Sequence, residues 1–353
     1  MEGLNFGKLI GLVGQANAEL ARYDGMLSSI VNPSILLSPI TTQEAVLSSR
    51  IEGTQATLDE VLEHDAGQDY DENKTKDIME VLNYRKVLIL AQNSLVERGL
   101  TLGMIREMHT ILMDSVRGQS KSPGEFRNDQ NWIGPPGCQI EQATFVPPSP
   151  LRLLDHLQSL EKYIASNDVD ALIQTAVVHA QFELIHPFRD GNGRIGRLLI
   201  PLFLFYKRRL SAPMFYLSSY LEANRDAYYG RLQGISKNKD WDNWIAFFLE
   251  GVVSQARENT RKVQATLKLY DEMKLRIREI THSQHTIQIL DAIFYRPIFQ
   301  TSDIVSRTKL AKQTVMPLLR QLKDAGVLMV ISEASGRRPA RLAFLALLNI
   351  TEG

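Results

Sequence analysis

The stretch His186-Pro-Phe-Arg-Asp-Gly-Asn-Gly-Arg-Ile-Gly-Arg197 gathers one histidine, one aspartate, three glycines and three arginines within twelve residues. The residues before it, 169–185, and those after it, up to Arg209, repeat apolar side chains at the spacing of an α-helix. We therefore predict a loop between two helices. Similar helical spacing recurs through most of the chain, so the predicted fold class is mostly α.

The glycines of this loop match a nucleotide-binding pattern only by their spacing. Gly191-Asn-Gly193-Arg-Ile-Gly196 fits G-x-G-x-x-G, the dinucleotide-binding fingerprint, which requires a strand before the first glycine and a βαβ unit around it. The preceding segment is helical here, which contradicts that interpretation. The P-loop pattern also fails, because no Lys-Ser or Lys-Thr pair follows the glycines.

The loop is nevertheless suited to bind an anion. The first N–H groups of the following helix lack intrahelical partners and carry the positive end of its dipole. Gly191 and Gly193 allow an anion to approach the backbone closely. Arg194 and Arg197 share a face of the first turn, where cations oppose the dipole unless they bind an external polyanion such as a triphosphate. The alternative is a pair of surface arginines in intrahelical ion pairs.

Two other side chains of the loop carry chemistry. A neutral His186 imidazole can take a proton from a hydroxyl group. Asp190, the one acid of the loop, most simply holds Mg²⁺ beside bound phosphates. We expect Phe188 to be a core anchor and His179 to be packed behind the site.

Composition limits the class of protein. The 353 residues are 44% hydrophobic and 23% charged, with 40 basic and 40 acidic side chains, so disorder and a global attraction to nucleic acid are excluded. Cys138 is the only cysteine, which excludes an internal disulfide. The longest apolar run, 198–206, is far shorter than the roughly 20 residues of a membrane span. We expect a cytoplasmic protein that does not bind membranes.

The chain divides into three predicted parts, 1–75, 76–280 and 285–353, with an acidic surface linker over 63–72. Within the second part, segment 122–150 is rich in glycine and proline, and strand-like runs at 131–133 and 143–146 bracket a Gly-Pro-Pro-Gly turn. We interpret it as a β-hairpin over a helical body; the alternative is a plain long connection.

The third part predicts a winged helix-turn-helix: helices at 286–294, from Thr301 and up to Ala325, then two strands around a polar tip. Lys309 and Lys312 begin the candidate recognition helix, and Arg337-Arg338 lie at the tip. Pro317 would kink that helix deeper in. DNA contact, target docking and dimer formation are the alternatives for this part.

The motif 186–197 resembles H-P-F-x-[D/E]-G-N-G-R-x-x-R of the Fic family, with every defining position matched. The resemblance implies a Fic-type helical bundle with a β-hairpin flap over 124–148, and the transfer of AMP from ATP to a Ser, Thr or Tyr hydroxyl of a target protein. It implies His186 as general base and Asp190 as the Mg²⁺ ligand. The implied phosphate-binding residues are Gly191, Asn192, Gly193, Arg194, Ile195, Gly196 and Arg197. By the same resemblance the target docks along residues 131–146, and Tyr229 flanks the nucleotide; the alternative for Tyr229 is a core aromatic. The protein itself is a further candidate partner, by self-modification or as a homodimer.

A second motif lies near the N-terminus. Thr41-x-x-Glu44 predicts a capping box and Gly53 a helix end, so a short helix covers about 41–53. Its end, Ser48-Ser-Arg-Ile-Glu52-Gly53, resembles the family's inhibitory motif [S/T]-x-x-x-E-[G/N]. The resemblance implies that Glu52 pairs with Arg197 and keeps ATP in an unproductive pose. Some members of the family also use this glutamate to remove AMP from a target, so the reverse reaction stays open as an alternative. The alternative function is a winged-helix DNA-binding regulator with a nucleotide-sensing core.

Overall fold

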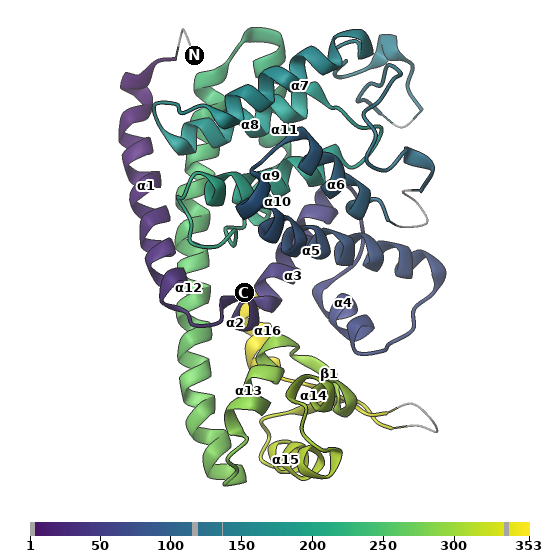
Figure 1. Cartoon of the computed structure of the whole chain (residues 1–353), viewed down its shortest axis with the longest axis vertical. Helices are drawn as coiled ribbons and strands as arrows, with labels where there is room; N and C mark the ends of the chain where they lie inside the picture. The colour runs from purple at the N-terminus through teal and green to yellow at the C-terminus, as the bar shows by residue number, and fades with distance from the viewer. Residues whose placement is uncertain (1–3, 115–118, 136, 335–338) are drawn as a thin grey trace.

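The computed structural model describes residues 4–114, 119–135, 137–334 and 339–353 (Figure 1). Its helices are α1 Phe6–Ser29, α2 Pro33–Leu36, α3 Ser38–Ile51, α4 Leu58–Asp65, α5 Glu72–Arg98, α6 Leu102–Leu112, α7 Pro150–Ala165, α8 Ala171–Ile185, α9 Asn192–Tyr206, α10 Ser218–Ala223, α11 Arg225–Asn238, α12 Trp241–Thr281, α13 Thr286–Tyr295, α14 Thr301–Thr308, α15 Lys312–Asp324 and α16 Leu345–Glu352. The strands are β1 Ile298–Gln300, β2 Met329–Ser332 and β3 Arg341–Ala343, and 3₁₀ turns cover Gln119–Lys121 and Ile140–Gln142. The prediction of a mostly helical fold is confirmed.

Helices α8 and α9 form the centre of the larger part of the molecule. Most side chains of both helices are buried, and in α9 these include the polar Asn192, Arg194 and Arg197. The two helices pack against each other, and α1, α7, α11 and α12 surround α8 while α3, α5 and α6 contact α9. The loop 186–191 joins the two helices at one end of this pair. The site is therefore built on the most buried elements of the fold.

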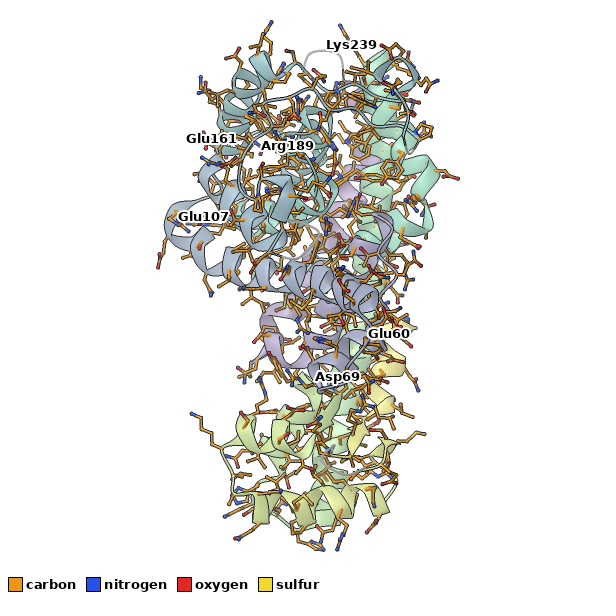
Figure 2. The ribbon with its side chains drawn as sticks, turned by 90° about the vertical axis from the view of Figure 1, so that its right-hand side faces the viewer. Glu60, Asp69, Glu107, Glu161, Arg189 and Lys239 are labelled. Atoms are coloured by element: carbon orange, nitrogen blue, oxygen red, sulfur yellow. The ribbon has the colours of Figure 1, made fainter. Side chains whose placement is uncertain are left out.

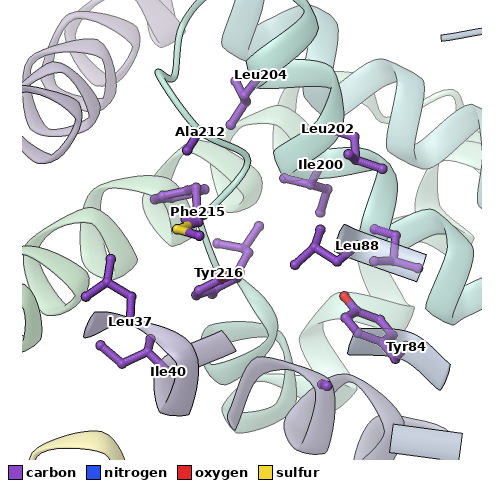
Figure 3. Close-up of a cluster of buried hydrophobic side chains, with 14 of the residues drawn as sticks. Leu37, Ile40, Tyr84, Leu88, Ile200, Leu202, Leu204, Ala212, Phe215 and Tyr216 are labelled. Carbon is purple, nitrogen blue, oxygen red and sulfur yellow. The ribbon is translucent and has the colours of Figure 1, made fainter. Parts of the chain in front are cut away.

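Helix α3 is held against this centre by a shared apolar cluster. Figure 3 shows Leu37 and Ile40 at the start of α3 in one cluster with Tyr84 and Leu88 of α5 and Ile200 of α9. The predicted capping box at Thr41 is wrong, because the helix begins at Ser38 and its Pro39 occupies the first turn. Thr41 instead lies inside the helix. The predicted end is present, since Gly53 has a φ of +99°.

The long helix α12 joins the two ends of the molecule (Figure 1). Its first half packs against α1, and its second half carries α13, α15 and α16. No helix in the described part of the chain combines the length and the hydropathy that crossing a membrane requires.

The C-terminal part contains the three predicted helices and two predicted strands. An extra strand, β1, completes an antiparallel sheet of order β1-β3-β2, and an extra helix, α16, follows it. Lys309 does not begin the candidate recognition helix, because it ends α14 with a φ of +58° and α15 begins at Lys312. Pro317 lies inside α15. Arg337 and Arg338 fall outside the described residues. The assignment of this part as a winged helix stays a prediction.

The predicted acidic linker is only partly a linker. A capping box between Thr57 and Glu60 starts α4, which extends to Asp65 and packs its apolar side on β1. Asp65 pairs with Arg85 at 2.6 Å, so this carboxylate is not simply solvated. Figure 2 shows Glu60 and Asp69 near the junction between the larger and the smaller part of the molecule.

Across the described residues of 124–148, the predicted β-hairpin is reduced to one antiparallel bridge between Ile133 and Phe145. Ile133 N–H donates to the Phe145 carbonyl at 2.9 Å, and Thr144 N–H donates to the Ile133 carbonyl at 2.8 Å. The run 143–146 cannot extend in either direction. The 3₁₀ turn at 140–142 precedes it, and the prolines 147 and 148, which donate no backbone hydrogen bond, follow it. The segment is therefore a loop with a single β-bridge.

Candidate active site

His186 ends helix α8 in a left-handed conformation, with φ at +49°. Its Nδ1 lies 3.3 Å from the Glu183 carbonyl oxygen. Because a carbonyl oxygen only accepts hydrogen bonds, Nδ1 carries the hydrogen and Nε2 keeps the lone pair of the neutral ring. Burial lowers the pKa of His186 to about 4, so the ring is neutral near pH 7. A neutral imidazole with a free Nε2 lone pair is the form that accepts a proton.

The loop after His186 is closed by Asn192. Phe188 N–H donates to Asn192 Oδ1 at 2.8 Å, and Asn192 Nδ2 donates to the Phe188 carbonyl at 2.8 Å. Gly191 takes a φ of +77°, which glycine adopts without steric cost. The Asn192 side chain is thus used within the loop, and a cradle for phosphate would be formed here by backbone N–H groups.

Phe188 anchors the loop in the core, as predicted. Its ring is fully buried and stacks on His109 of α6 at a centroid distance of 3.8 Å. His109 Nε2 donates to the Asp190 carbonyl at 3.0 Å, while its Nδ1 accepts from Gly124 N–H at 2.9 Å. Sequence reasoning missed His109, because no local pattern connects α6 with this loop. His179 is buried as expected, and its Nδ1 donates to the Gly196 carbonyl at 2.9 Å.

We expect Phe188→Ala to lower the free energy of unfolding by about 3–5 kcal/mol, the usual cost of removing a fully buried aromatic ring. Phe6→Ala is the matched control, because Phe6 is 38% exposed and its truncation should cost well under half as much. Urea unfolding followed by circular dichroism measures both. Equal costs for the two variants would contradict the anchoring role of Phe188.

Arg197 is held by the end of helix α3. Its Nη2 donates to Glu52 Oε1 at 2.7 Å and to the Ser48 carbonyl at 2.8 Å, and its Nε donates to Ser48 Oγ at 2.8 Å. Only 1% of the Arg197 side chain is exposed. Burial opposes ionisation of Glu52, but the charge of Arg197 and its hydrogen bond outweigh burial and lower the Glu52 pKa. The pair is therefore ionised on both sides.

The Glu52 carboxylate lies directly on the glycine loop. A β-carbon placed on Gly193 would lie 2.1 Å from Glu52 Oε1 and 3.0 Å from Arg197 Nη1. The space that makes Gly193 suitable for close approach of an anion is thus taken by the carboxylate of Glu52. Nη1 of Arg197 is buried without a hydrogen-bond partner among the described residues. An anionic ligand that reached this guanidinium would compete with Glu52.

Arg194 turns to a different acid. Its Nη1 lies 3.3 Å from Glu80 of α5, and its Nη2 lies 3.6 Å from Asp190 Oδ1. Both motif arginines are buried, so the alternative of surface ion pairs is wrong. The side chain of Asp190 is 47% exposed and its Oδ1 accepts from Gly191 N–H at 2.6 Å.

The chemistry of Asp190 fits a magnesium site of the kind that ATP brings with it. Mg²⁺ usually keeps several waters and takes only one or two protein carboxylates beside substrate phosphates. Across the described ranges, no group of three or more His, Cys, Asp or Glu side chains is placed to hold a metal. The half-exposed carboxylate of Asp190 beside the loop supplies the one protein ligand that Mg²⁺ bound to ATP needs.

Two further acids, Glu183 of α8 and the buried Glu44 of α3, interact electrostatically with Arg197. Burial raises the pKa of Glu183 to about 8 and that of Glu44 to about 7, in both cases against the opposing charge of Arg197. Glu44, two turns before Glu52 in α3, accepts hydrogen bonds from Ser218 Oγ at 2.6 Å and Ser218 N–H at 3.2 Å. Glu44 therefore anchors α3 to the core, which is a role that the capping-box interpretation missed.

Tyr229 lies at the edge of the site. It is 42% exposed, and its ring centroid lies 5.0 Å from that of the buried Tyr228. Burial and the charge of Glu52 raise the pKa of Tyr229 to about 12, so the hydroxyl stays neutral. The core aromatic of this helix is Tyr228, whose hydroxyl donates to His179 Nε2 at 2.9 Å.

The site is thus a helix N-terminus of the kind that binds phosphates, with a neutral histidine on the same loop. Comparison with known families places it more closely. The model of the Fic/DOC family N-terminal region matches residues 10–93, and the model of the Fic/DOC family matches residues 99–204. Together the two models span more than half of the chain, which therefore belongs to the Fic/DOC family.

Individual relatives agree with this assignment. The chain is 30% identical over 96 residues to a probable protein adenylyltransferase of Aquifex aeolicus, a match that covers 27% of this chain and 30% of that protein. It is 31% identical over 128 residues to the protein adenylyltransferase Fic of Drosophila erecta, covering 34% of this chain and 23% of that protein. The chain thus spans less than a third of these relatives' length. The crystal structure of a Fic family protein from Desulfovibrio desulfuricans shares the fold over 94% of this chain and 95% of that one, with a TM-score of 0.60 at 19% identity.

Proposed function

We propose that this chain is a protein adenylyltransferase, which transfers AMP from ATP to a Ser, Thr or Tyr hydroxyl of a target protein. The observation that carries the proposal is the neutral His186, with its lone pair on Nε2, on the same loop as an anion-binding helix N-terminus. Relatives named protein adenylyltransferase support the same chemistry.

In the proposed reaction, Nε2 of His186 takes the proton of the target hydroxyl while the hydroxyl oxygen bonds to the α-phosphorus of ATP. The bond from that phosphorus to the oxygen bridging the α- and β-phosphates breaks, and diphosphate leaves. Backbone N–H groups at 191–193 would hold the α-phosphate, and Arg194 and Arg197 would hold the outer phosphates. Mg²⁺, held by Asp190, would neutralise phosphate charge when bound.

The proposal includes inhibition of AMP transfer by Glu52, at the end of helix α3. Glu52 occupies both the space over Gly193 and Nη2 of Arg197, so it competes with the phosphate that Arg197 would hold. The same carboxylate, placed over the loop, is suited to orient a water molecule. We therefore keep removal of AMP from a modified target as the second candidate activity. A labelled target should lose its AMP in the presence of the parental chain, and this loss should require Glu52.

The test uses the purified full chain with ATP labelled at the α-phosphate and Mg²⁺. We expect the label to appear on protein, and intact-mass measurement of lysate proteins to show a gain of one AMP. ATP labelled only at the γ-phosphate should transfer nothing. Transfer of the γ-label, or binding of ATP with no transfer from the Glu52→Gly variant to any lysate protein, would contradict the proposal.

The lowered pKa of His186 predicts a flat pH profile. A base acts while it is neutral, and a pKa of about 4 keeps His186 neutral well below the usual value of 6.5. Removing Glu52, whose charge raises this pKa, extends the neutral range further. We expect the transfer rate of the Glu52→Gly variant to stay level from about pH 8 to about pH 6. A rate that halves near pH 6.5 would show an ordinary, solvated histidine.

A further inference from the structure

One buried arginine outside the motif ties the His186 loop to both ends of the segment 131–146. Arg127 is 3% exposed. Its Nε donates to the His186 carbonyl at 2.9 Å, its Nη1 to the Asp129 carbonyl at 3.1 Å, and its Nη2 to the Pro148 carbonyl at 2.5 Å. Its own N–H donates to the Pro187 carbonyl at 2.9 Å. The guanidinium therefore joins three backbone segments at one point.

These acceptors have a common feature. The carbonyls of Ile185 and His186 end helix α8, where unpaired carbonyls carry the negative end of the dipole. Nη2 of Arg127 also lies 3.4 Å from the Ile185 carbonyl, so the cation meets two carbonyls of that helix end. The carbonyls of Asp129 and Pro148 lie just before and just after the segment 131–146. Arg127 thus stabilises the left-handed turn at His186 and sets how far that turn lies from the segment.

Weaker ties reinforce this connection at the surface. Arg189 donates to the side chains of Asp129 at 3.1 Å, Asn128 at 2.9 Å and Ser122 at 2.9 Å, and it is visible at the surface in Figure 2. Asn131 Nδ2 donates to the Phe188 carbonyl at 3.2 Å. Exposed pairs of this kind contribute little alone, whereas a buried guanidinium with four backbone acceptors is costly to remove.

We infer that Arg127 is a positioning residue, which holds the imidazole of His186 at a fixed distance from a target chain lying along residues 131–146. The inference rests on the proposed adenylyltransferase activity and deepens it. Among the described residues, Arg127 forms hydrogen bonds with 129, 148 and 185–187, and none with the phosphate-binding residues 191–197. Its loss should therefore slow transfer without weakening ATP binding.

The experiment compares Arg127→Met and Arg127→Lys with Arg106→Met, all in a Glu52→Gly background. Arg106 is the matched control, because its Nε donates to the Gly124 carbonyl at 2.7 Å and its guanidinium lies over Phe126, yet in the described part of the chain it forms no hydrogen bond with the His186 loop. We expect Arg127→Met to slow single-turnover transfer about 100-fold, the effect of a displacement near 1 Å at a reacting group. ATP affinity, measured by calorimetry, should change less than about threefold. Arg127→Lys should recover part of the rate, and Arg106→Met should keep it.

Hydrogen exchange supplies a readout that does not need activity. Arg127→Met should raise amide exchange together at 127–131 and 186–190, whereas Arg106→Met should raise it only around 124–126. A folded Arg127→Met protein with unchanged transfer, or with ATP affinity reduced as much as its rate, overturns the inference. If the Glu52→Gly parent itself transfers no AMP, the proposed function fails. Hydrogen exchange then tests the positioning role of Arg127 by itself, and unchanged exchange at 186–190 in the Arg127→Met variant overturns that role.

Discussion

Replacing Glu52 by glycine should raise the rate of AMP transfer by the full chain about 10- to 150-fold. The change removes a charge-assisted hydrogen bond of 2.7 Å to Arg197 and empties the space over Gly193. A hydrogen bond to a charged group contributes about 1.5–3 kcal/mol, and a phosphate that no longer has to displace it gains that amount in binding. The effect is measured by comparing the initial rates at which the parental chain and the Glu52→Gly variant incorporate the α-phosphate label into protein.

The controls separate release of Arg197 from loss of any acid. Glu52→Gln keeps the size of the side chain, and should activate in the same direction but less. Glu107→Gln removes an exposed pair with Arg98 at 2.7 Å and should leave the rate unchanged. Because Glu52 is also a partner of a buried arginine, we expect Glu52→Gly to lower the melting temperature. A rate that stays at the parental level while ATP binding improves would refute the inhibitory role.

Replacing His186 by alanine in the Glu52→Gly background should lower transfer about 1,000-fold. General base catalysis by a positioned side chain contributes roughly 100- to 10,000-fold. Nδ1 of this ring bonds to the Glu183 carbonyl, and no hydrogen bond within the described ranges occupies Nε2, the nitrogen that would act as the base. ATP affinity should stay within about threefold, because the imidazole supplies no hydrogen bond to a phosphate cradle formed by backbone N–H groups. Single-turnover incorporation of label, together with calorimetry of ATP binding, tests both statements.

His156→Ala on α7 is the control for loss of a histidine, and should keep the parental rate. His179→Ala is expected to fail differently, because His179 bonds to the Gly196 carbonyl and to Tyr228 inside the core. That variant should lose stability along with activity. Transfer that survives His186→Ala would remove the base assignment and leave the phosphate-binding role of the loop standing.

Local pattern accounts for much of this molecule. Helices α8 and α9 were both expected within a few residues of their observed bounds, because long amphipathic or apolar runs report their own periodicity. Short or irregular elements were less predictable. The predicted hairpin over 124–148 is a loop with a single β-bridge among the described residues. Strand β1 was missed because its three residues are too few to show alternation.

The capping box at Thr41 failed for a reason that sequence spacing conceals. Thr41 and Glu44 have the right separation, but Ser218 and Tyr216 approach them from elsewhere in the chain, and the helix extends back to Ser38. Tertiary partners then replace the local hydrogen bonds that the pattern predicts.

The order of residues from His186 to Arg197 is sufficient to specify a loop, a helix start and the chemical groups beside them, since all of these depend on neighbours a few positions apart. The partners that surround the loop come from distant helices: Glu80 from α5, His109 from α6, and Ser48 and Glu52 from α3. Only packing brings those groups within hydrogen-bond distance, because the burial of α8 and α9 selects which faces of the other helices meet them. For Glu52, the family resemblance supplied that partnership in advance; for His109, Glu80 and Arg127, nothing short of the folded chain indicates it.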